Sequence, residues 1–185
     1  MEATVTAPPE VISNKSVIRL LRVDITELEV DGFVFYAQPD LNLGSGFGGA
    51  IGVRGGASIQ KELNQLAADG PLPTGTVVVS EAGKLKANYI LHAVGPRFKE
   101  AETERKLLDT VNRCLAAAEE KGMKTLAFPL MGAGYYGIPP AVSARVMMDA
   151  LNAHLAGSSG IEEILICVFD TPHFNAVQAT MAAQL

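Results

Sequence analysis

Residues 34–56 read VFYAQPDLNLGSGFGGAIGVRGG. An apolar, β-compatible run, Phe33 to Tyr36, leads into a segment with seven glycines among thirteen positions, Gly44 to Gly56. Glycine loses more backbone freedom on folding than any other residue, so this cluster requires a reason. A strand that passes through glycines into a helix start at Ala50 and Ile51 predicts a phosphate cradle, in which backbone N–H groups and a helix N-terminus approach an anion. A flexible surface loop is the alternative interpretation.

The composition predicts one domain that is built around one core. The chain has 185 residues, of which 48% are hydrophobic and 19% are charged. A net charge of −5 argues against a broad basic surface for nucleic acid, although backbone amides can still bind a phosphate-bearing small molecule. Cys114 and Cys167 lie far apart in apolar runs, as expected for reduced core cysteines of an intracellular, cytoplasmic protein. We expect no membrane segment, because no apolar run approaches the ~18 residues of a membrane span.

Strands and helices alternate along most of the chain. Residues 1–14 are polar and contain two prolines, and we expect them to form a loosely ordered tail before a single domain over residues 15–185. The expected strands cover residues 16–23, 33–36, 76–79, 88–94, 125–129 and 161–169. The expected helices cover residues 57–68, 102–121 and 141–155, with a final helix capped by Thr171. This alternation predicts an α/β fold with helices on both faces of a mixed, largely parallel sheet.

A second glycine loop, Met131 to Gly137, follows the expected strand at residues 125–129. Ligands of open α/β sheets bind beyond the carboxyl ends of the strands. We therefore expect this loop to face the first one, Leu43 to Gly49, over a diphosphate. The chain has neither a dinucleotide-binding G-x-G-x-x-G in the required context nor a P-loop with its Lys and Ser/Thr, so the two commonest phosphate loops are excluded.

Several segments, in their order and spacing, resemble one known family. They are Asp24-Ile25-Thr26, LNLGSGFGGAI at residues 41–51, GPLPTGTVVVS at residues 70–80, ILHAVGP at residues 90–96, and FPLMGAGYYGIP at residues 128–139. Together they resemble the macro domain, the ADP-ribose-binding (Appr-1″-p processing) family. The resemblance implies a three-layer α/β/α fold, a cleft for ADP-ribose or an ADP-ribosylated protein, and no cofactor or metal. It indicates no oligomeric state.

The same resemblance implies a binding site that involves both loops and two strand ends. Asp24 would accept a hydrogen bond from the adenine amino group, although an Asp at that position can also cap a turn. Tyr136, or else Tyr135, would lie against the distal ribose, and Phe169 and Asp170 would form the adenine-side wall, unless Phe169 packs in the core. The implied ligand-binding residues are Asp24, Ile25, Gln38, Gly44, Ser45, Gly46, Phe47, Gly48, Gly49, Gly132, Ala133, Gly134, Tyr135, Tyr136, Gly137, Phe169 and Asp170.

The chain departs from the family at the usual catalytic positions. Hydrolytic members of the commonest class carry Asn-Ala-Ala-Asn at the end of the second strand and an Asp inside the first glycine loop; the second Asn corresponds here to Gln38 and the Asp to Gly48. Gln38 keeps an amide but displaces it by about 1.5 Å, and a misplacement of about 1 Å can slow a catalytic step ~100-fold. Gly48 has no ionisable group. We expect Asp40 to be a turn residue and His92 a core residue.

Three hypotheses follow from these residues. The favoured one is a recognition module that binds ADP-ribose or a related ADP-ribosyl group with weak or no hydrolysis. The alternative is a hydrolase of ADP-ribosyl conjugates, either mono-ADP-ribosyl protein or O-acetyl-ADP-ribose, with a non-standard catalytic arrangement in which Gln38 is the only named candidate. A third is a scaffold adapted to another nucleotide, because Phe35, Tyr36 and Phe47 add bulk around the cleft.

Overall fold

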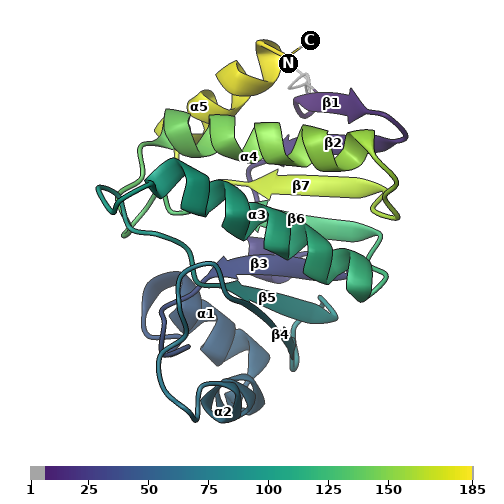
Figure 1. The fold of residues 1–185 in the computed structure, drawn as a ribbon. Coiled ribbons are helices and arrows are strands. Elements are labelled where there is room, and N and C mark those ends of the chain that lie inside the picture. The colour runs from purple at the N-terminus through teal and green to yellow at the C-terminus, as the bar shows by residue number, and fades with distance from the viewer. Residues whose placement is uncertain (1–6, 185) are drawn as a thin grey trace, which may run out of the picture.

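The structure, a computed structural model, describes residues 7–184 and is organised around a seven-stranded sheet (Figure 1). The strands are β1 (Glu10–Ser13), β2 (Ser16–Leu21), β3 (Gly32–Tyr36), β4 (Val77–Glu81), β5 (Tyr89–Ala93), β6 (Thr125–Pro129) and β7 (Glu163–Cys167). Their order across the sheet is β1-β2-β7-β6-β3-β5-β4. The five inner strands are parallel, whereas β1 and β4 pair antiparallel at the two edges.

Helices cover both faces of this sheet (Figure 1). They are η1 (Ile25–Glu27), α1 (Gly46–Gly55), α2 (Ala57–Leu66), α3 (Thr103–Glu120), α4 (Pro140–Ala156) and α5 (Thr171–Ala182). One apolar core joins α3, α4 and α5 to the sheet, and a second one joins η1, α1 and α2 to the opposite face. All five residues of β3 are buried, because helices cover that strand on both sides. The predicted three-layer α/β/α fold with a mixed, largely parallel sheet is confirmed.

The structure corrects three boundaries. The expected tail over residues 1–14 is too long, because Glu10–Ser13 forms β1, and Asn14 turns the chain into β2 with a φ of 57°. Residues 1–6 of that tail lie outside the described residues. The helix expected from Ala50 begins four residues earlier, at Gly46. Asp170 rather than Thr171 caps α5, because its side chain accepts a hydrogen bond from the His173 N–H.

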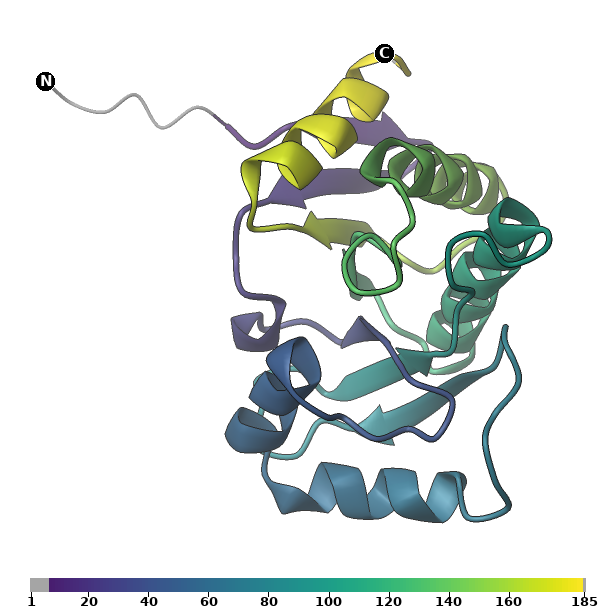
Figure 2. The same cartoon turned by 90° about the vertical axis from the view of Figure 1, so that its left-hand side faces the viewer.

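The position of the site follows from a divergence inside the sheet. β3 pairs with β5 along five residues, but it pairs with β6 only at Gly32 and Phe33. Beyond Phe33 the carboxyl ends of β3 and β6 lack a shared ladder, and each end leads into a glycine loop. A parallel sheet offers its ligand crevice at such a point, outside the strand ends. Figure 2 views the molecule from the side to which β3 and β7 point, with α1 and the loop after β6 both toward the viewer.

Candidate functional site

A cleft of about 570 Å³ lies between the two glycine loops. The residues that line it come from the end of β3, the loop that follows β3, the first turn of α1, the end of β6 and the loop that follows β6. They are Phe35, Tyr36, Gln38, Leu43, Ser45, Gly46, Phe47, Gly48, Pro129, Leu130, Gly132, Gly134, Tyr135 and Tyr136. The two loops therefore face one another, as the sequence predicted.

Side chains of the chain itself hold the first loop in place. The Asp40 carboxylate accepts a hydrogen bond from the Asn42 N–H at 2.9 Å, and the Asn42 side chain accepts one from the Gly44 N–H at 2.8 Å. From α2, the side-chain oxygen Oε1 of Gln60 accepts a hydrogen bond from the Leu43 N–H at 2.9 Å. Asp40 thus acts as the turn residue that the sequence predicted. These hydrogen bonds give the first loop a defined backbone path, which favours the phosphate cradle over the alternative of a flexible surface loop.

The first glycine cluster extends over the whole of α1, and three of its glycines, Gly46, Gly48 and Gly49, form the opening turn. Ser45 is the N-cap, and its side chain makes no capping hydrogen bond. Within residues 7–184, the backbone N–H groups of Gly46, Phe47 and Gly48 have no protein acceptor. Free N–H groups at a helix N-terminus carry a partial positive charge and point out of the helix along its axis, toward a group bound at that end. Gly46 and Gly48 line the cleft, so this end of α1 faces it.

The second loop presents backbone donors from the other side. Gly132 has a φ of 71° and Gly137 a φ of 77°, a backbone region that favours glycine. In the described part of the chain, the N–H groups of Gly132, Gly134, Tyr135 and Tyr136 also have no protein acceptor. The cleft is therefore bordered by unpaired amide donors from two directions, an arrangement that suits an anion with several oxygens.

The two adjacent tyrosines of the second loop differ in exposure. Tyr135 is 81% exposed, whereas Tyr136 is half-buried and packs against Tyr36, with 4.6 Å between the ring centroids. Tyr135 lies edge-on to Tyr136, and both line the cleft. Tyr136 thus presents a supported aromatic surface, and Tyr135 is the outward-facing member of the pair.

Phe35 and Tyr36 line the cleft, where we expected them from the sequence to add bulk without counting them among the binding residues. Phe35 meets Phe47 edge to face at 5.1 Å, and the Tyr36 hydroxyl donates to the Pro96 carbonyl. Burial raises the pKa of the Tyr36 phenol, so the hydroxyl stays protonated and remains a donor. The available signal was their position at the carboxyl end of a fully apolar strand.

Position 48 has no space for a side chain in this structure. A Cβ atom built on Gly48 would lie 1.8 Å from the backbone carbonyl oxygen of Leu43 and 3.0 Å from the Phe35 ring. The first loop therefore passes directly over this glycine. Any side chain there would have to displace backbone, so this loop path has no room for the Asp that hydrolytic members of the family carry at the corresponding position.

Eight of the implied binding residues lie outside the cleft lining, and four of these follow the ends of β2 and β7. The Asp24 carboxylate caps η1 by accepting from the Thr26 N–H at 3.0 Å and from the Thr26 hydroxyl at 2.6 Å, and it pairs with Arg54 from α1. Ile25 is buried. Phe169 is 67% exposed at the end of β7, so it does not pack in the core, and Asp170 caps α5. Gly44, Gly49, Ala133 and Gly137 belong to the loops but do not line the cleft.

The Asp24 carboxyl is held in its ionised form. Partial burial acts to raise its pKa, but the hydrogen bonds from Thr26 and the charge of Arg54 outweigh that effect and hold the pKa below its usual value. The Arg54 guanidinium also donates to the Thr26 hydroxyl at 2.7 Å. This pairing joins η1 to the last turn of α1.

The lining of the cleft contains no Asp, Glu, His, Lys, Arg or Cys among the described residues. His92 lies behind it as a fully buried core residue, as predicted, with Nε2 at 2.7 Å from the Ser80 hydroxyl. Burial lowers the pKa of His92 to about 4, so its imidazole is neutral at pH 7. The cleft therefore offers amide, hydroxyl and aromatic groups for binding but no group with the pKa of a general base.

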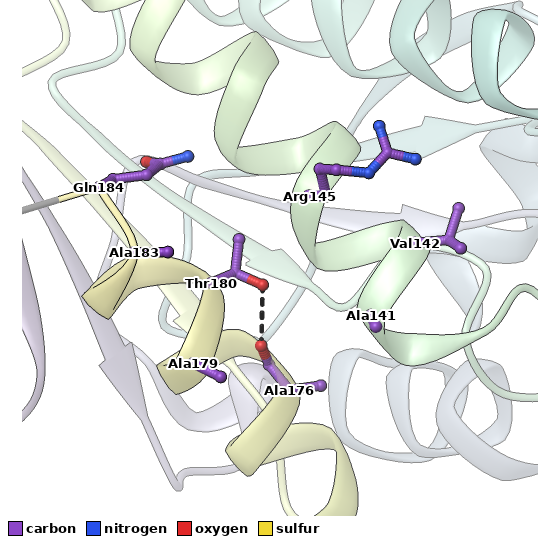
Figure 3. A pocket seen from close by; sticks show the side chains of 8 residues that line it. All are labelled: Ala141, Val142, Arg145, Ala176, Ala179, Thr180, Ala183 and Gln184. Carbon is purple, nitrogen blue, oxygen red and sulfur yellow. Dashed lines mark hydrogen bonds between the residues drawn. The ribbon is translucent and has the colours of Figure 1, made fainter.

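A second hollow, of about 540 Å³, lies between α4 and α5 (Figure 3). Small side chains line most of it, including Ala141, Ala176 and Ala179. Its polar groups are already engaged, because the Thr180 hydroxyl donates to the Ala176 carbonyl and Arg145 pairs with Glu104 at 2.8 Å. Unpaired backbone N–H groups border this hollow from one helix end alone, at Ala141 and Val142 of the described residues, whereas they border the cleft from two loops. Over residues 7–184 there is also no cluster of three or more metal-ligating side chains and no helix long and apolar enough to cross a membrane.

Comparison with known proteins gives consistent results. The macro domain family model matches residues 37–147. A macro domain-containing protein of Caldanaerobacter subterraneus is 37% identical over 158 residues, which cover 84% of this chain and 90% of that protein. An Oceanobacillus iheyensis macrodomain mutant solved with ADPR superposes with a TM-score of 0.91 at 22% identity, covering 96% of this chain and 98% of that one. A Trypanosoma brucei macrodomain in complex with ADP-ribose gives 0.78 at 23% identity, covering 88% and 68%.

Proposed function

The chain belongs to the macro domain family, and we propose that it binds ADP-ribose or a related ADP-ribosyl group in the cleft between its two glycine loops, with weak or no hydrolysis. One observation carries the proposal. The cleft is bordered by unpaired backbone N–H groups from both loops and is lined by no ionisable catalytic group.

The diphosphate fits the amide donors. Oxygens of a diphosphate would accept hydrogen bonds from the first turn of α1 and from the unpaired N–H groups of the second loop, at residues 132 and 134–136, with the helix dipole adding favourable charge. No lysine is required, which is consistent with the net charge of −5. Two relatives by fold, from Oceanobacillus iheyensis and Trypanosoma brucei, were solved with ADPR and with ADP-ribose, which supports the same ligand class here.

The remaining parts of the ligand would meet residues on either side of the amide donors. The distal ribose would lie against Tyr136, whose ring Tyr36 supports. The exposed Gln38 amide, which has no hydrogen-bond partner within residues 7–184, would be available for a ribose hydroxyl. At the other end, the ionised Asp24 would accept from the adenine amino group, and the exposed Phe169 ring would flank the base.

The same residues argue against efficient hydrolysis. A water molecule that attacks the anomeric carbon needs a base within hydrogen-bond reach. Gly48 supplies no base. The Asp40 carboxylate accepts a hydrogen bond from the Asn42 N–H and does not line the cleft. The buried His92 is neutral and does not line the cleft either. Tyr36 and Tyr136 both have pKa values raised by burial, so neither phenol is a base at pH 7.

Isothermal titration with free ADP-ribose tests the binding. Gly134→Glu is a suitable blocked variant, because Gly134 lines the cleft, has nothing within 4 Å of a built Cβ and has no positive φ. It introduces a negative charge opposite the diphosphate without distorting the loop. Gly134→Ala is the matched control and is expected to bind. Absence of heat with the wild type at high micromolar ADP-ribose would contradict the proposal.

An assay for free ADP-ribose decides between recognition and hydrolysis. The wild type is incubated with mono-ADP-ribosylated protein and, separately, with O-acetyl-ADP-ribose, and the product is measured against Gly134→Glu. We expect release close to that of the blocked variant. Turnover that Gly134→Glu abolishes would establish the hydrolase instead and would require a catalytic arrangement without a carboxylate in the cleft.

A further inference from the structure

Arg97 stands at the rim of the cleft. It follows β5 after Gly95 and Pro96, and the next residue, Phe98, donates its N–H to the Tyr136 carbonyl at 2.9 Å. The guanidinium carbon of Arg97 lies 5.6 Å from the ring centroid of Tyr135 and 5.5 Å from that of Tyr136. Both rings line the cleft, so the cation lies over its outer wall at cation–π distance.

The Arg97 guanidinium forms no salt bridge within residues 7–184, although its charge and that of Glu100 attract one another. Glu100 is nearby, but its carboxylate accepts the Arg97 backbone N–H at 2.9 Å and pairs with Lys106 at 3.0 Å. Across residues 7–184, no carboxylate oxygen lies within 4.0 Å of the guanidinium of Arg97 or the ammonium of Lys99. Both side chains belong to exposed residues. Two cations without a salt-bridge partner among the described residues thus lie two positions apart in a chain whose net charge is −5.

The arrangement leaves the hydrogen-bonding capacity of Arg97 available. A guanidinium stacked on an aromatic face keeps the N–H donors on its edge free, and their fork matches a carboxylate. Two exposed aromatic residues accompany it: Phe98, the next residue in the chain, is 43% exposed, and Tyr135 is 81% exposed. We call Arg97, Phe98, Lys99 and Tyr135 the Arg97 rim. It combines positive charge with aromatic surface, a combination suited to a peptide that carries acidic side chains.

We propose that the Arg97 rim recognises an acidic peptide segment adjoining the ADP-ribosylated residue of a target protein. The inference rests on the proposed function, because a distal ribose against Tyr136 places the bond to the carrier protein beside Tyr135 and Arg97. The carrier chain then leaves the cleft across the rim, where its acidic side chains meet the two cations. Free ADP-ribose has no such segment and gains nothing from the rim.

Three ligands test the inference in titrations at low salt: free ADP-ribose, an ADP-ribosylated peptide with acidic neighbours, and the same peptide with Gln and Asn replacing the acidic residues. The wild type is expected to prefer the acidic conjugate by about 3- to 10-fold, the effect of one or two exposed ion pairs. Arg97→Gln combined with Lys99→Gln should reduce that preference to about 2-fold or less, while the affinity for free ADP-ribose stays within about 2-fold. Added salt should weaken the preference in the wild type.

Lys121→Gln is the matched control, because the Lys121 ammonium also lies over a tyrosine ring, 5.2 Å from the Tyr89 centroid, but is remote from the cleft lining. It should keep the full preference. An equal loss of affinity for free ADP-ribose in the rim variant would mean that Arg97 contacts the nucleotide, which overturns the inference. Equal binding of both conjugates by the wild type, or tighter Arg97-dependent binding of an ADP-ribosylated oligonucleotide, overturns it too. If the wild type binds neither the conjugates nor free ADP-ribose, the proposed function itself is contradicted.

Discussion

At the scale of single residues, the glycines of α1 are not equivalent. A Cβ on Gly48 would meet the Leu43 carbonyl oxygen at 1.8 Å, whereas a Cβ on Gly52 meets only the Leu43 side chain, at 3.8 Å. Both lie in the same helix, and neither has a positive φ. The sequence identified Gly48 as the position of a lost carboxylate, but only the structure shows that backbone occupies the space.

The same substitution at these two glycines should have opposite effects on stability. Gly52→Ala is expected to raise the free energy of unfolding by about 0.5–1 kcal/mol, because alanine loses less backbone freedom in a helix. Gly48→Ala should lower it by about 1–3 kcal/mol, the usual effect of forcing atoms into filled space. Urea unfolding measures both. Gly48→Asp should be destabilised at least as much and should gain no hydrolysis; a stable, active Gly48→Asp variant would show that the loop path is not fixed.

The two loop tyrosines should differ in their effect on binding. Tyr136 is supported by Tyr36 at 4.6 Å, whereas Tyr135 is 81% exposed. Tyr136→Ala is therefore expected to weaken ADP-ribose binding by about 2- to 10-fold, the usual contribution of a packed aromatic contact. Tyr135→Ala should change the affinity by less than about 2-fold, because the Tyr135 ring of the wild type is mostly exposed to water and loses little of that exposure on binding. Titration of both variants checks this, and the reverse order would assign the ribose to Tyr135.

At the scale of elements, the sequence predicted most of the fold because the inner strands are apolar runs and helical patterns follow β3, β6 and β7 and the β4–β5 pair. It missed β1 because EVIS is four residues long and follows two prolines, so its pairing with β2 supplies the evidence for a strand. It placed the start of α1 too late because glycines at 46, 48 and 49 have low helix propensity. It predicted Phe35 and Tyr36 only as bulk around the cleft, not as binding residues, because an apolar strand pattern does not show where the neighbouring strand β6 ends its pairing.

The link between η1 and α1 gives a pH prediction. The folded pKa of Asp24 is depressed, so the ionised form stabilises the native state above the unfolded pKa of ~3.9, and that stabilisation is lost as the pH falls through the folded value. Asp24→Asn should therefore be less stable than the wild type at pH 6, and the difference should shrink as the pH falls below ~4. Urea midpoints between about pH 3 and about pH 6 measure it. A difference that is independent of pH would show that the Arg54 pairing contributes nothing through charge.

At the scale of the whole molecule, the divergence of β3 and β6 connects fold to function. Two glycine loops, which are separated by more than eighty residues in the sequence, meet because they leave adjacent strands whose ladder stops at Phe33. The alternation of elements predicted that meeting, because the carboxyl ends of parallel strands lie at one edge. The precise lining could not be predicted, since it depends on which side chains the splayed ends expose. Ligand binding should therefore connect α1 on one face to the loop before α4 on the other.

That connection predicts a specific thermal response. A ligand that binds only the native state stabilises it by about 2.7 kcal/mol at 100 times its Kd, which for a chain of this size raises Tm by about 5–10 °C. Each further tenfold in ligand concentration should add about 1.4 kcal/mol, so Tm should keep rising after the site is saturated. Gly134→Glu should remove the response to ADP-ribose, and Gly134→Ala should keep it. If another nucleotide raised Tm in this way while ADP-ribose had no effect, the scaffold would serve a different ligand, because a ligand stabilises the native state only if it binds there.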